Sequence, residues 1–213
     1  MDPETSFLAG LIELQYGQPV QESLRALAPK VPWALGWPDN NKSFWNAEAF
    51  MWGHKIEKQT RDLIAGELGF LQGGRNVDIG CGAYSYLPSV GFDLSEKMLQ
   101  FNEQCYDKVW GTVEETLPFL DSCFDSATAV FLFNYVVKYE FLLTEIFRIL
   151  KPGGRLAVVL SSHSVNEWQR QKEVTVLSAG EWDNLLQAAG FLVHFYEKEG
   201  LWFFVAHSAV KSS

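Results

Sequence analysis

Two glycines one residue apart follow a short apolar segment, and they constrain the fold of this chain more than any other feature. The segment reads Asn-Val-Asp-Ile-Gly-Cys-Gly over residues 76–82, and a second apolar segment, 89–93, ends on Asp93. Glycine has no Cβ, so the backbone at Gly80 and Gly82 can turn sharply and let a ligand approach closely. In a doubly wound sheet, a carboxylate at the end of the second strand lies where a ribose binds. The pattern predicts a nucleotide-like cofactor.

Composition limits what such a chain can bind. Its 213 residues suit one α/β domain with an extension, and an apolar share of 47% with a charged share of 20% is that of an ordinary globular protein. The formal net charge is -9 and no basic run occurs, which disfavours binding to nucleic acid. No apolar run reaches the roughly 18 residues of a membrane span. The chain also starts without the basic residues of a secretory signal. We therefore expect a cytoplasmic protein without a membrane partner.

The three cysteines are odd in number and have no CxxC spacing; they are Cys81, Cys105 and Cys123. Such a pattern favours free thiols in a reducing compartment over a disulfide framework or a zinc site. We expect neither a disulfide nor a bound metal.

The first 70 residues carry no strand pattern, and we expect a helical N-terminal extension that caps the domain of residues 71–213 without folding independently. The sequence predicts a helix over 6–16, a proline-interrupted loop over 29–39 and a long helix from residue 43 past residue 63. Four of the eight tryptophans precede residue 53. They either attach the extension to the α/β domain or wall a hydrophobic acceptor pocket.

From residue 75 onward, short apolar runs alternate with helical patterns. The predicted strands are 75–79, 89–93, 107–111, 125–132, 154–161, 191–197 and 201–208, and the predicted helices are 95–104, 136–150 and 178–189. This alternation predicts an α/β fold with a mostly parallel, Rossmann-like sheet of seven strands. The last two runs are separated by only three residues, too few for a parallel crossover, so they should form an antiparallel hairpin.

Two kinds of cofactor compete for the glycine turn. In a dinucleotide fold, a third glycine lets a full helix start next to the pyrophosphate. Here that position is Ser85, preceded by the bulky Tyr84, and Pro88 follows Gly82 by only six residues. Any helix in this gap is a turn or two at most, so a pyrophosphate would lose much of its binding site. The balance favours a cofactor without phosphates.

Five segments in register resemble the class I S-adenosylmethionine (SAM)-dependent methyltransferases, and most of all the small-molecule enzymes with a UbiE-like domain. Residues 77–82 resemble the family's glycine-rich motif, and 90–99 resemble its acidic second strand and the helix that follows. Residues 111–125 are similar to the loop after strand three and the start of strand four. Segments 145–156 and 181–191 resemble the approaches to strands five and six.

The resemblance implies SAM as the cofactor and assigns roles to single positions. Asp78, Gly80 and Gly82 would line the methionine part, and Asp93 would accept hydrogen bonds from the ribose hydroxyls. The other positions implied around the cofactor are Cys81, Leu94, Met98, Thr112, Val113, Glu114 and Val130.

Methyl transfer from a sulfonium needs mainly that nucleophile, methyl and sulfur be aligned and that water be excluded. A base is needed only where the acceptor must lose a proton, and His54 and His163 are the first candidates, followed by Asn134, Tyr135 and Trp168. Phe131, Phe133 and Tyr135 are expected in the sheet core. The acceptor is expected to be a small, partly apolar molecule. A SAM-binding module without catalysis and an NAD(P)-dependent oxidoreductase stay open as alternatives, and the sequence leaves the oligomeric state open.

Overall fold

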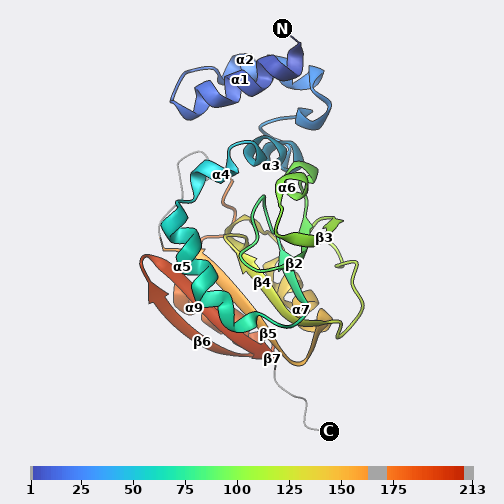
Figure 1. The fold of residues 1–213 in the computed structure, drawn as a ribbon, viewed down its shortest axis with the longest axis vertical. Coiled ribbons are helices and arrows are strands. Elements are labelled where there is room, and N and C mark those ends of the chain that lie inside the picture. The colour runs from blue at the N-terminus through green and yellow to red at the C-terminus, as the bar shows by residue number, and fades with distance from the viewer. Residues whose placement is uncertain (1, 163–171, 209–213) are drawn as a thin grey trace.

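A seven-stranded sheet forms the centre of the molecule in the computed structural model, which describes residues 2–162 and 172–208 (Figure 1). The strands are β1 (Asn76–Ile79), β2 (Ser89–Asp93), β3 (Cys105–Trp110), β4 (Phe124–Val130), β5 (Leu150–Ser161), β6 (Phe191–Lys198) and β7 (Leu201–Ser208). Their order is β3-β2-β1-β4-β5-β7-β6. β1 to β5 pair in parallel, whereas β7 is antiparallel to both of its neighbours. The predicted Rossmann-like sheet and its C-terminal hairpin are confirmed.

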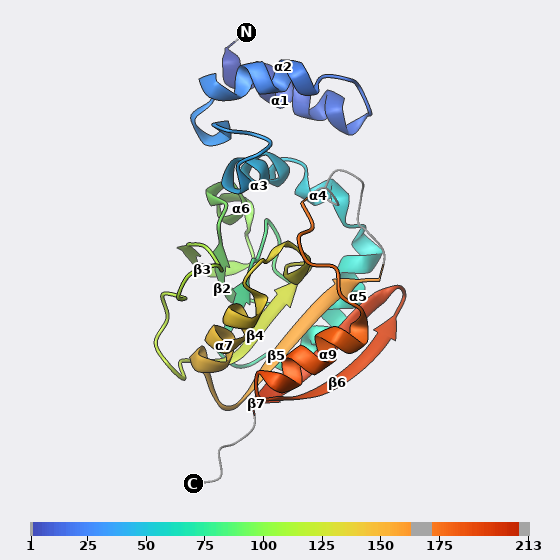
Figure 2. The ribbon, with the colours of Figure 1, turned by 180° about the vertical axis from the view of Figure 1, so that it is seen from behind.

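Helices cover both faces of this sheet. α7 (Tyr139–Ile149) and α9 (Ala179–Ala188) lie on the face turned to the viewer in Figure 2, and α5 (Lys58–Leu68) crosses the opposite face in Figure 1. The larger apolar cluster includes Leu142, Ile146 and Phe204, all at most 1% exposed. Burying such side chains contributes roughly 1.5–3 kcal/mol each, so this face supplies most of the core.

Local signals fix several helix ends. At the start of α9, the Ser178 hydroxyl accepts from the Glu181 amide while the Glu181 carboxylate accepts from the Ser178 amide, which is a capping box. At the start of α1 (Pro3–Gln15), the Asp2 side chain accepts from the Thr5 amide at 3.1 Å. The predicted helix over 6–16 is therefore confirmed and begins earlier, because its cap lies at residue 2.

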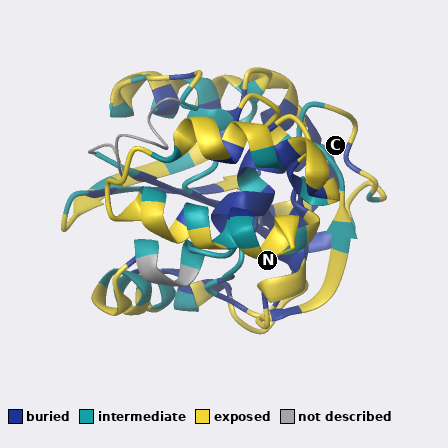
Figure 3. Cartoon of the chain, turned by 90° about the horizontal axis from the view of Figure 1, so that it is seen from above, coloured by how far each residue is buried: buried dark blue, intermediate teal, exposed yellow. Residues whose placement is uncertain are grey.

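The N-terminal extension is more broken than the sequence predicts. α2 (Gln21–Leu27) was not expected, and short 3₁₀ turns cover Ala28–Lys30 and Pro32–Ala34. The predicted long helix from residue 43 past 63 is wrong: it is divided into α3 (Asn41–Ala49), α4 (Trp52–Lys55) and α5. α3 is buried on several sides, between the N-terminal helices and the sheet domain, and buried residues gather at the centre when the chain is seen from above (Figure 3).

The connection from β1 to β2 contains no helix. Residues 80–88 form turns and bends, and β2 pairs in parallel beside β1 with Val77 opposite Val90. The sequence allows at most a turn or two of helix here, and the structure has none. α6 (Glu96–Phe101) follows β2 directly and starts from the side-chain cap of Ser95.

No helix in the described part of the chain is both long enough and apolar enough to cross a lipid bilayer.

Candidate cofactor site

A pocket of about 780 Å³, including its open mouth, lies at the carboxyl ends of the parallel strands. Its walls come from the ends of β1, β2 and β4, from the loop after β3, and from α3 and α4. The lining residues are Asn41, Trp45, Trp52, Gly80, Gly82, Asp93, Leu94, Met98, Thr112, Val113, Glu114, Val130, Phe131, Leu132, Tyr135 and Val136.

A smaller pocket of about 230 Å³ adjoins it and shares Trp52, Gly80, Val130 and Phe131 with it. The residues that line only this second pocket are Asp78, Cys81, Tyr84 and Tyr86. Every one of the eleven positions that the resemblance implies around the cofactor lines one pocket or the other. The structure thus brings together residues from four separate segments, 78–82, 93–98, 112–114 and residue 130.

The turn after β1 needs glycine for two reasons. Gly80 and Gly82 have φ angles of +64° and +56°, in the left-handed region that side chains disfavour. A Cβ on Gly80 would also lie 2.5 Å from Leu132 Cδ1, and one on Gly82 would lie 3.2 Å from the indole of Trp52. Trp52 therefore packs directly over the turn, between the two pockets.

Asp93 ends β2 with its carboxylate buried at the pocket. Its Oδ2 accepts from the Gly82 amide at 2.9 Å, and its Oδ1 accepts from the Ser95 amide at 2.8 Å. Burial raises the pKa of Asp93 to about 6, although these backbone donors act in the opposite direction. Each oxygen keeps a lone pair for a ligand, since one backbone donor per oxygen does not saturate it.

Asp78 is a second buried carboxylate, at the floor of the smaller pocket. Its Oδ1 accepts from Thr128 Oγ1 at 2.8 Å, and burial raises its pKa to about 6. Both acids are mainly ionised at neutral pH, so the two pockets are negatively charged.

Residues 112–114 line the pocket, but the Glu114 side chain is already engaged. Its carboxylate accepts from the Val137 amide at 2.9 Å and from the Lys138 amide at 3.1 Å. The Thr112 hydroxyl accepts from the Glu114 amide at 3.2 Å. Glu114 therefore ties the loop after β3 to the start of α7.

Aromatic side chains form one wall of the larger pocket. Trp45 lies edge-on to Tyr135 with ring centroids 4.9 Å apart, and the centroids of Trp45 and Trp52 are 6.4 Å apart. Trp33 and Trp37 instead pack edge-on against Phe7 within the extension. Trp33 and Trp37 thus belong to the core of the extension itself, while Trp45 and Trp52 line the larger pocket; that this wall binds an acceptor stays a prediction.

Phe133 is buried in the core as expected, and Phe131 packs partly buried against the smaller apolar cluster but also lines both pockets. The expectation that Tyr135 belongs to the sheet core is wrong, because it lines the larger pocket. Phe131 has a φ of +56°, and this backbone turn at the end of β4 directs it to both pockets. No signal in the sequence marks that turn, because the residue is not a glycine. The sequence did not single out Trp45 and Trp52 as the tryptophans that line the pocket, because the residues they contact are distant in sequence.

The candidate bases stay untested. His163, Trp168 and the side chain of His54 lie outside the described residues. Tyr135 is the tyrosine in the described lining of the larger pocket, and burial raises its pKa further above its ordinary value. Its phenol is therefore protonated at neutral pH and can donate a hydrogen bond without acting as a base.

The site suits a cationic adenosyl group better than a dinucleotide. Among the described residues, the linings of both pockets contain no lysine or arginine, and they contain Asp78, Asp93 and Glu114. No helix starts after the glycine turn to meet a pyrophosphate. Leu94, Met98 and Val113 supply apolar surface of the kind on which a base can pack.

Fold and site define a Rossmann-like α/β domain with a ligand pocket at the switch between its strands. Residues 77–158 match the methyltransferase domain family. The α/β part of the chain thus resembles class I SAM-dependent methyltransferase domains, a class whose cofactor is SAM.

The curated relatives match part of the chain, as two of them illustrate. It is 33% identical over 108 residues to the demethylmenaquinone methyltransferase of Tropheryma whipplei, covering 45% of each chain. It is 39% identical over 111 residues to the ubiquinone/menaquinone biosynthesis C-methyltransferase UbiE of Geobacter sulfurreducens, covering 42% of each chain. The match therefore spans less than half the length of these relatives.

Solved structures share the fold at lower identity. A Haloferax volcanii protein in complex with the Trm112 methyltransferase activator has a TM-score of 0.62 and 20% identity, covering 78% of this chain and 97% of that one. A SAM-dependent methyltransferase of Thermotoga maritima has a TM-score of 0.58 and 22% identity, covering 75% and 93%. The [4+2]-cyclase SpnF has a TM-score of 0.58 and 18% identity, covering 71% and 80%. The fold is therefore shared by proteins of different activity.

Proposed function

We propose that this protein is a SAM-dependent methyltransferase that acts on a small molecule. The observation that carries the proposal is the buried Asp93 carboxylate at a glycine turn, in a pocket whose described lining has acidic but no basic residues. An acidic pocket favours a sulfonium cation and disfavours the phosphates of a dinucleotide. The match of residues 77–158 to methyltransferase domains supports the same conclusion.

The residues divide naturally between the parts of the cofactor. We infer that Asp93 accepts from the ribose hydroxyls, with Leu94 and Met98 beside the adenine. The Asp78 carboxylate in the smaller pocket can bind the ammonium group of the methionine part, and the turn at Gly80 and Gly82 leaves room for the amino-acid end of the cofactor. The remaining proposed contacts are Cys81, Thr112, Val113, Glu114 and Val130.

When bound, SAM supplies an electrophilic methyl group on sulfur. The chain then needs to hold an acceptor in line with that methyl and to exclude water. Trp52 packs against Gly82, and both Trp52 and Phe131 line both pockets. Tyr135 can orient an acceptor by donating its phenolic hydrogen.

The acceptor we propose is a planar, largely apolar ring compound. Trp45, Trp52 and Tyr135 offer an aromatic wall beside the cofactor pocket, and such walls bind flat apolar molecules. The relatives named for demethylmenaquinone and ubiquinone biosynthesis make a quinone-type ring the leading candidate. Residues 1–70 then act as a cap that supplies this wall from α3 and α4, without forming an independent domain.

Calorimetry with S-adenosylhomocysteine, SAM and NADH tests the cofactor, and transfer of a labelled methyl group to naphthoquinols and other small phenols tests the activity. We expect binding of both sulfur compounds, no binding of NADH, and labelled product from a quinol. Cofactor binding without transfer to any acceptor favours a non-catalytic SAM-binding module. Binding of NADH alone would overturn the proposal in favour of an oxidoreductase.

A further inference from the structure

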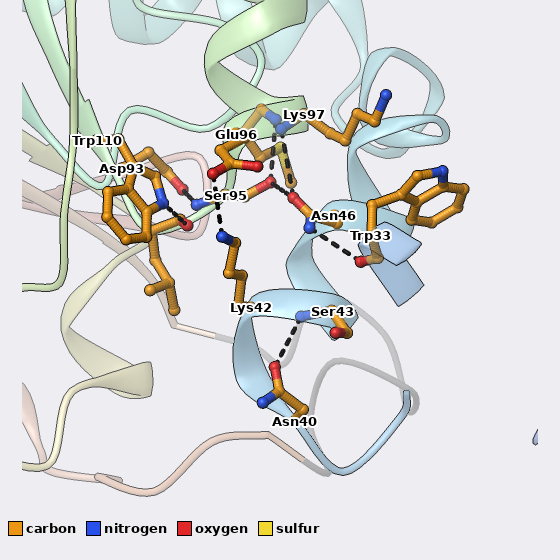
Figure 4. A network of polar contacts seen from close by, with 12 residues as sticks. Trp33, Asn40, Lys42, Ser43, Asn46, Asp93, Ser95, Glu96, Lys97 and Trp110 are labelled. Carbon is orange, nitrogen blue, oxygen red and sulfur yellow. Dashed lines mark hydrogen bonds and ion pairs between the residues drawn. The ribbon is translucent and has the colours of Figure 1, made fainter. Parts of the chain in front are cut away.

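Asn46 connects the N-terminal extension to the cofactor site through a buried hydrogen-bond network (Figure 4). It lies on α3 and is 1% exposed. Its Nδ2 donates to the Trp33 carbonyl at 3.0 Å, within the extension. Its Oδ1 accepts from Ser95 Oγ at 2.8 Å and from the Lys97 amide at 3.3 Å, both at the start of α6. One side chain thus joins two parts of the chain that are about fifty residues apart.

Ser95 carries this connection to Asp93. The Ser95 amide donates to Asp93 Oδ1 at 2.8 Å, and the Ser95 hydroxyl accepts from the Met98 amide at 3.0 Å. The hydroxyl has a single proton, which it gives to Asn46, so the orientation of the serine is fully determined. Because Leu94 lies between the two, the position of Ser95 sets the turn that presents both Asp93 and Leu94 to the pocket.

We propose that Asn46 is a positioning residue for cofactor binding: it holds the turn of residues 93–95 in the geometry that the ribose requires, and it acts through Ser95. This inference rests on the proposed SAM-binding function. The same helix places Asn41 and Trp45 in the pocket wall, so α3 contacts the site directly. Through Asn46 and Ser95 it also holds Asp93 by hydrogen bonds.

Two neighbouring contacts provide matched controls. Lys42 on α3 forms an ion pair with Glu96 on α6 at 3.1 Å, and both side chains are substantially exposed. Exposed pairs of this kind contribute little to stability. Ser43 on α3 is buried and donates to the Leu35 carbonyl at 2.6 Å, within the extension. Lys42→Ala removes an exposed bond between the same two helices, and with it the contact of the ammonium with the Trp110 ring, whose indole donates to the Leu94 carbonyl. It therefore tests whether exposed contacts near the turn matter. Ser43→Ala removes a buried bond from the same helix that does not lead to Asp93.

The test is titration of each variant with S-adenosylhomocysteine, beside the melting temperature without ligand. The wild type must first bind S-adenosylhomocysteine. If it does not, the result contradicts the proposed function and not the positioning role of Asn46. We expect Asn46→Ala to weaken binding roughly tenfold, with Lys42→Ala and Ser43→Ala within twofold of the wild type. Asn46→Asp keeps both acceptor contacts to α6, so its affinity should lie closer to the wild type than that of Asn46→Ala.

A double-mutant cycle separates positioning from general stability. Because Asn46 acts through Ser95, the affinity loss of Asn46→Ala with Ser95→Ala should equal that of Ser95→Ala alone. Should Asn46→Ala fail to fold, Asn46→Ser replaces it, since serine keeps a polar atom but shortens the reach to Ser95; the same loss is expected. Unchanged affinity in the Asn46 variant, or fully additive losses in the cycle, overturns the proposal.

Discussion

The amide of Gly82 donates a hydrogen bond to Oδ2 of Asp93 at 2.9 Å. This bond joins the turn after β1 to the end of β2, so the two sequence motifs form one structural unit. Both carboxylate oxygens of Asp93 are oriented by backbone amides before any ligand binds. Such orientation reduces the ordering cost of binding, because the acceptor geometry is already fixed.

Cofactor binding should depend on pH through Asp93. Burial raises its pKa to about 6, and ribose hydroxyls bind the ionised carboxylate better than the protonated acid. Affinity for S-adenosylhomocysteine should therefore be constant above about pH 7 and fall by up to about tenfold per pH unit below about pH 6. Calorimetry across this range measures it. An affinity that stays flat down to about pH 5 contradicts the role of Asp93.

Without ligand, Asp78 should reduce stability at neutral pH. Its folded-state pKa is raised to about 6 from 3.8, so the native state binds more protons between these values. The free energy of unfolding therefore falls as pH rises from about 4 to about 6, by up to about 3 kcal/mol from this group. Asp78→Asn keeps an acceptor for Thr128 without the charge. We expect it to be more stable than the wild type in urea at about pH 8, with the difference gone near pH 4; lower stability at pH 8 refutes this account.

Gly82→Ala should weaken both the fold and the site. A φ of +56° costs a side chain about 1–2 kcal/mol, and the new Cβ would lie 3.2 Å from the Trp52 indole. Gly153 is the matched control, since its φ is +73° and no atom lies within 4 Å of its Cβ position.

Urea unfolding should give a stability loss for Gly153→Ala and an equal or larger one for Gly82→Ala, because of the added contact with Trp52. Titration with S-adenosylhomocysteine should give a loss of affinity for Gly82→Ala alone. Equal affinity in the two variants would mean that the turn does not contact the ligand.

Gly91 on β2 leaves room for two sulfur atoms. A Cβ there would lie 2.4 Å from Cys105 Sγ and 3.0 Å from Cys81 Sγ, and both cysteines are buried. Gly91→Ala should therefore destabilise the protein by about 1–3 kcal/mol through overpacking. Adding Cys105→Ala removes the nearer sulfur and should recover part of the loss in urea unfolding. If the double variant is no more stable than Gly91→Ala, the loss of stability does not come from overpacking against Cys105.

Much of the α/β domain could be predicted because its signals are local. Asp93 closes a short apolar run, and only three residues separate Glu197 from Leu201, which forces a hairpin. Residues 151–154, which read Lys-Pro-Gly-Gly, form a bulge within β5, where Phe124 pairs with Leu150 and Ser126 pairs with Arg155. Gly153 has a φ of +73° there, as its residue type suggests.

The extension and the aromatic wall could not be predicted, because distant contacts decide them. The chain breaks after α3 so that Trp45 can meet Tyr135 while Phe50 meets Phe101 and Trp33. A single straight helix cannot make all of these ring contacts. Tyr135 and Phe101 lie about fifty to ninety residues away in the sequence, and Trp33 lies in the extension. No periodic pattern in one segment records such constraints.

The most direct measurement is the affinity of S-adenosylhomocysteine for the wild type, for Asp93→Ala and for Asp107→Ala. Asp107 is an exposed carboxylate on the neighbouring strand β3, so its removal controls for the loss of one negative charge. We predict one ligand per chain for the wild type and for Asp107→Ala, with binding lost or reduced at least about tenfold in Asp93→Ala. Equal affinity in all three proteins, or no binding to any of them, would contradict the account.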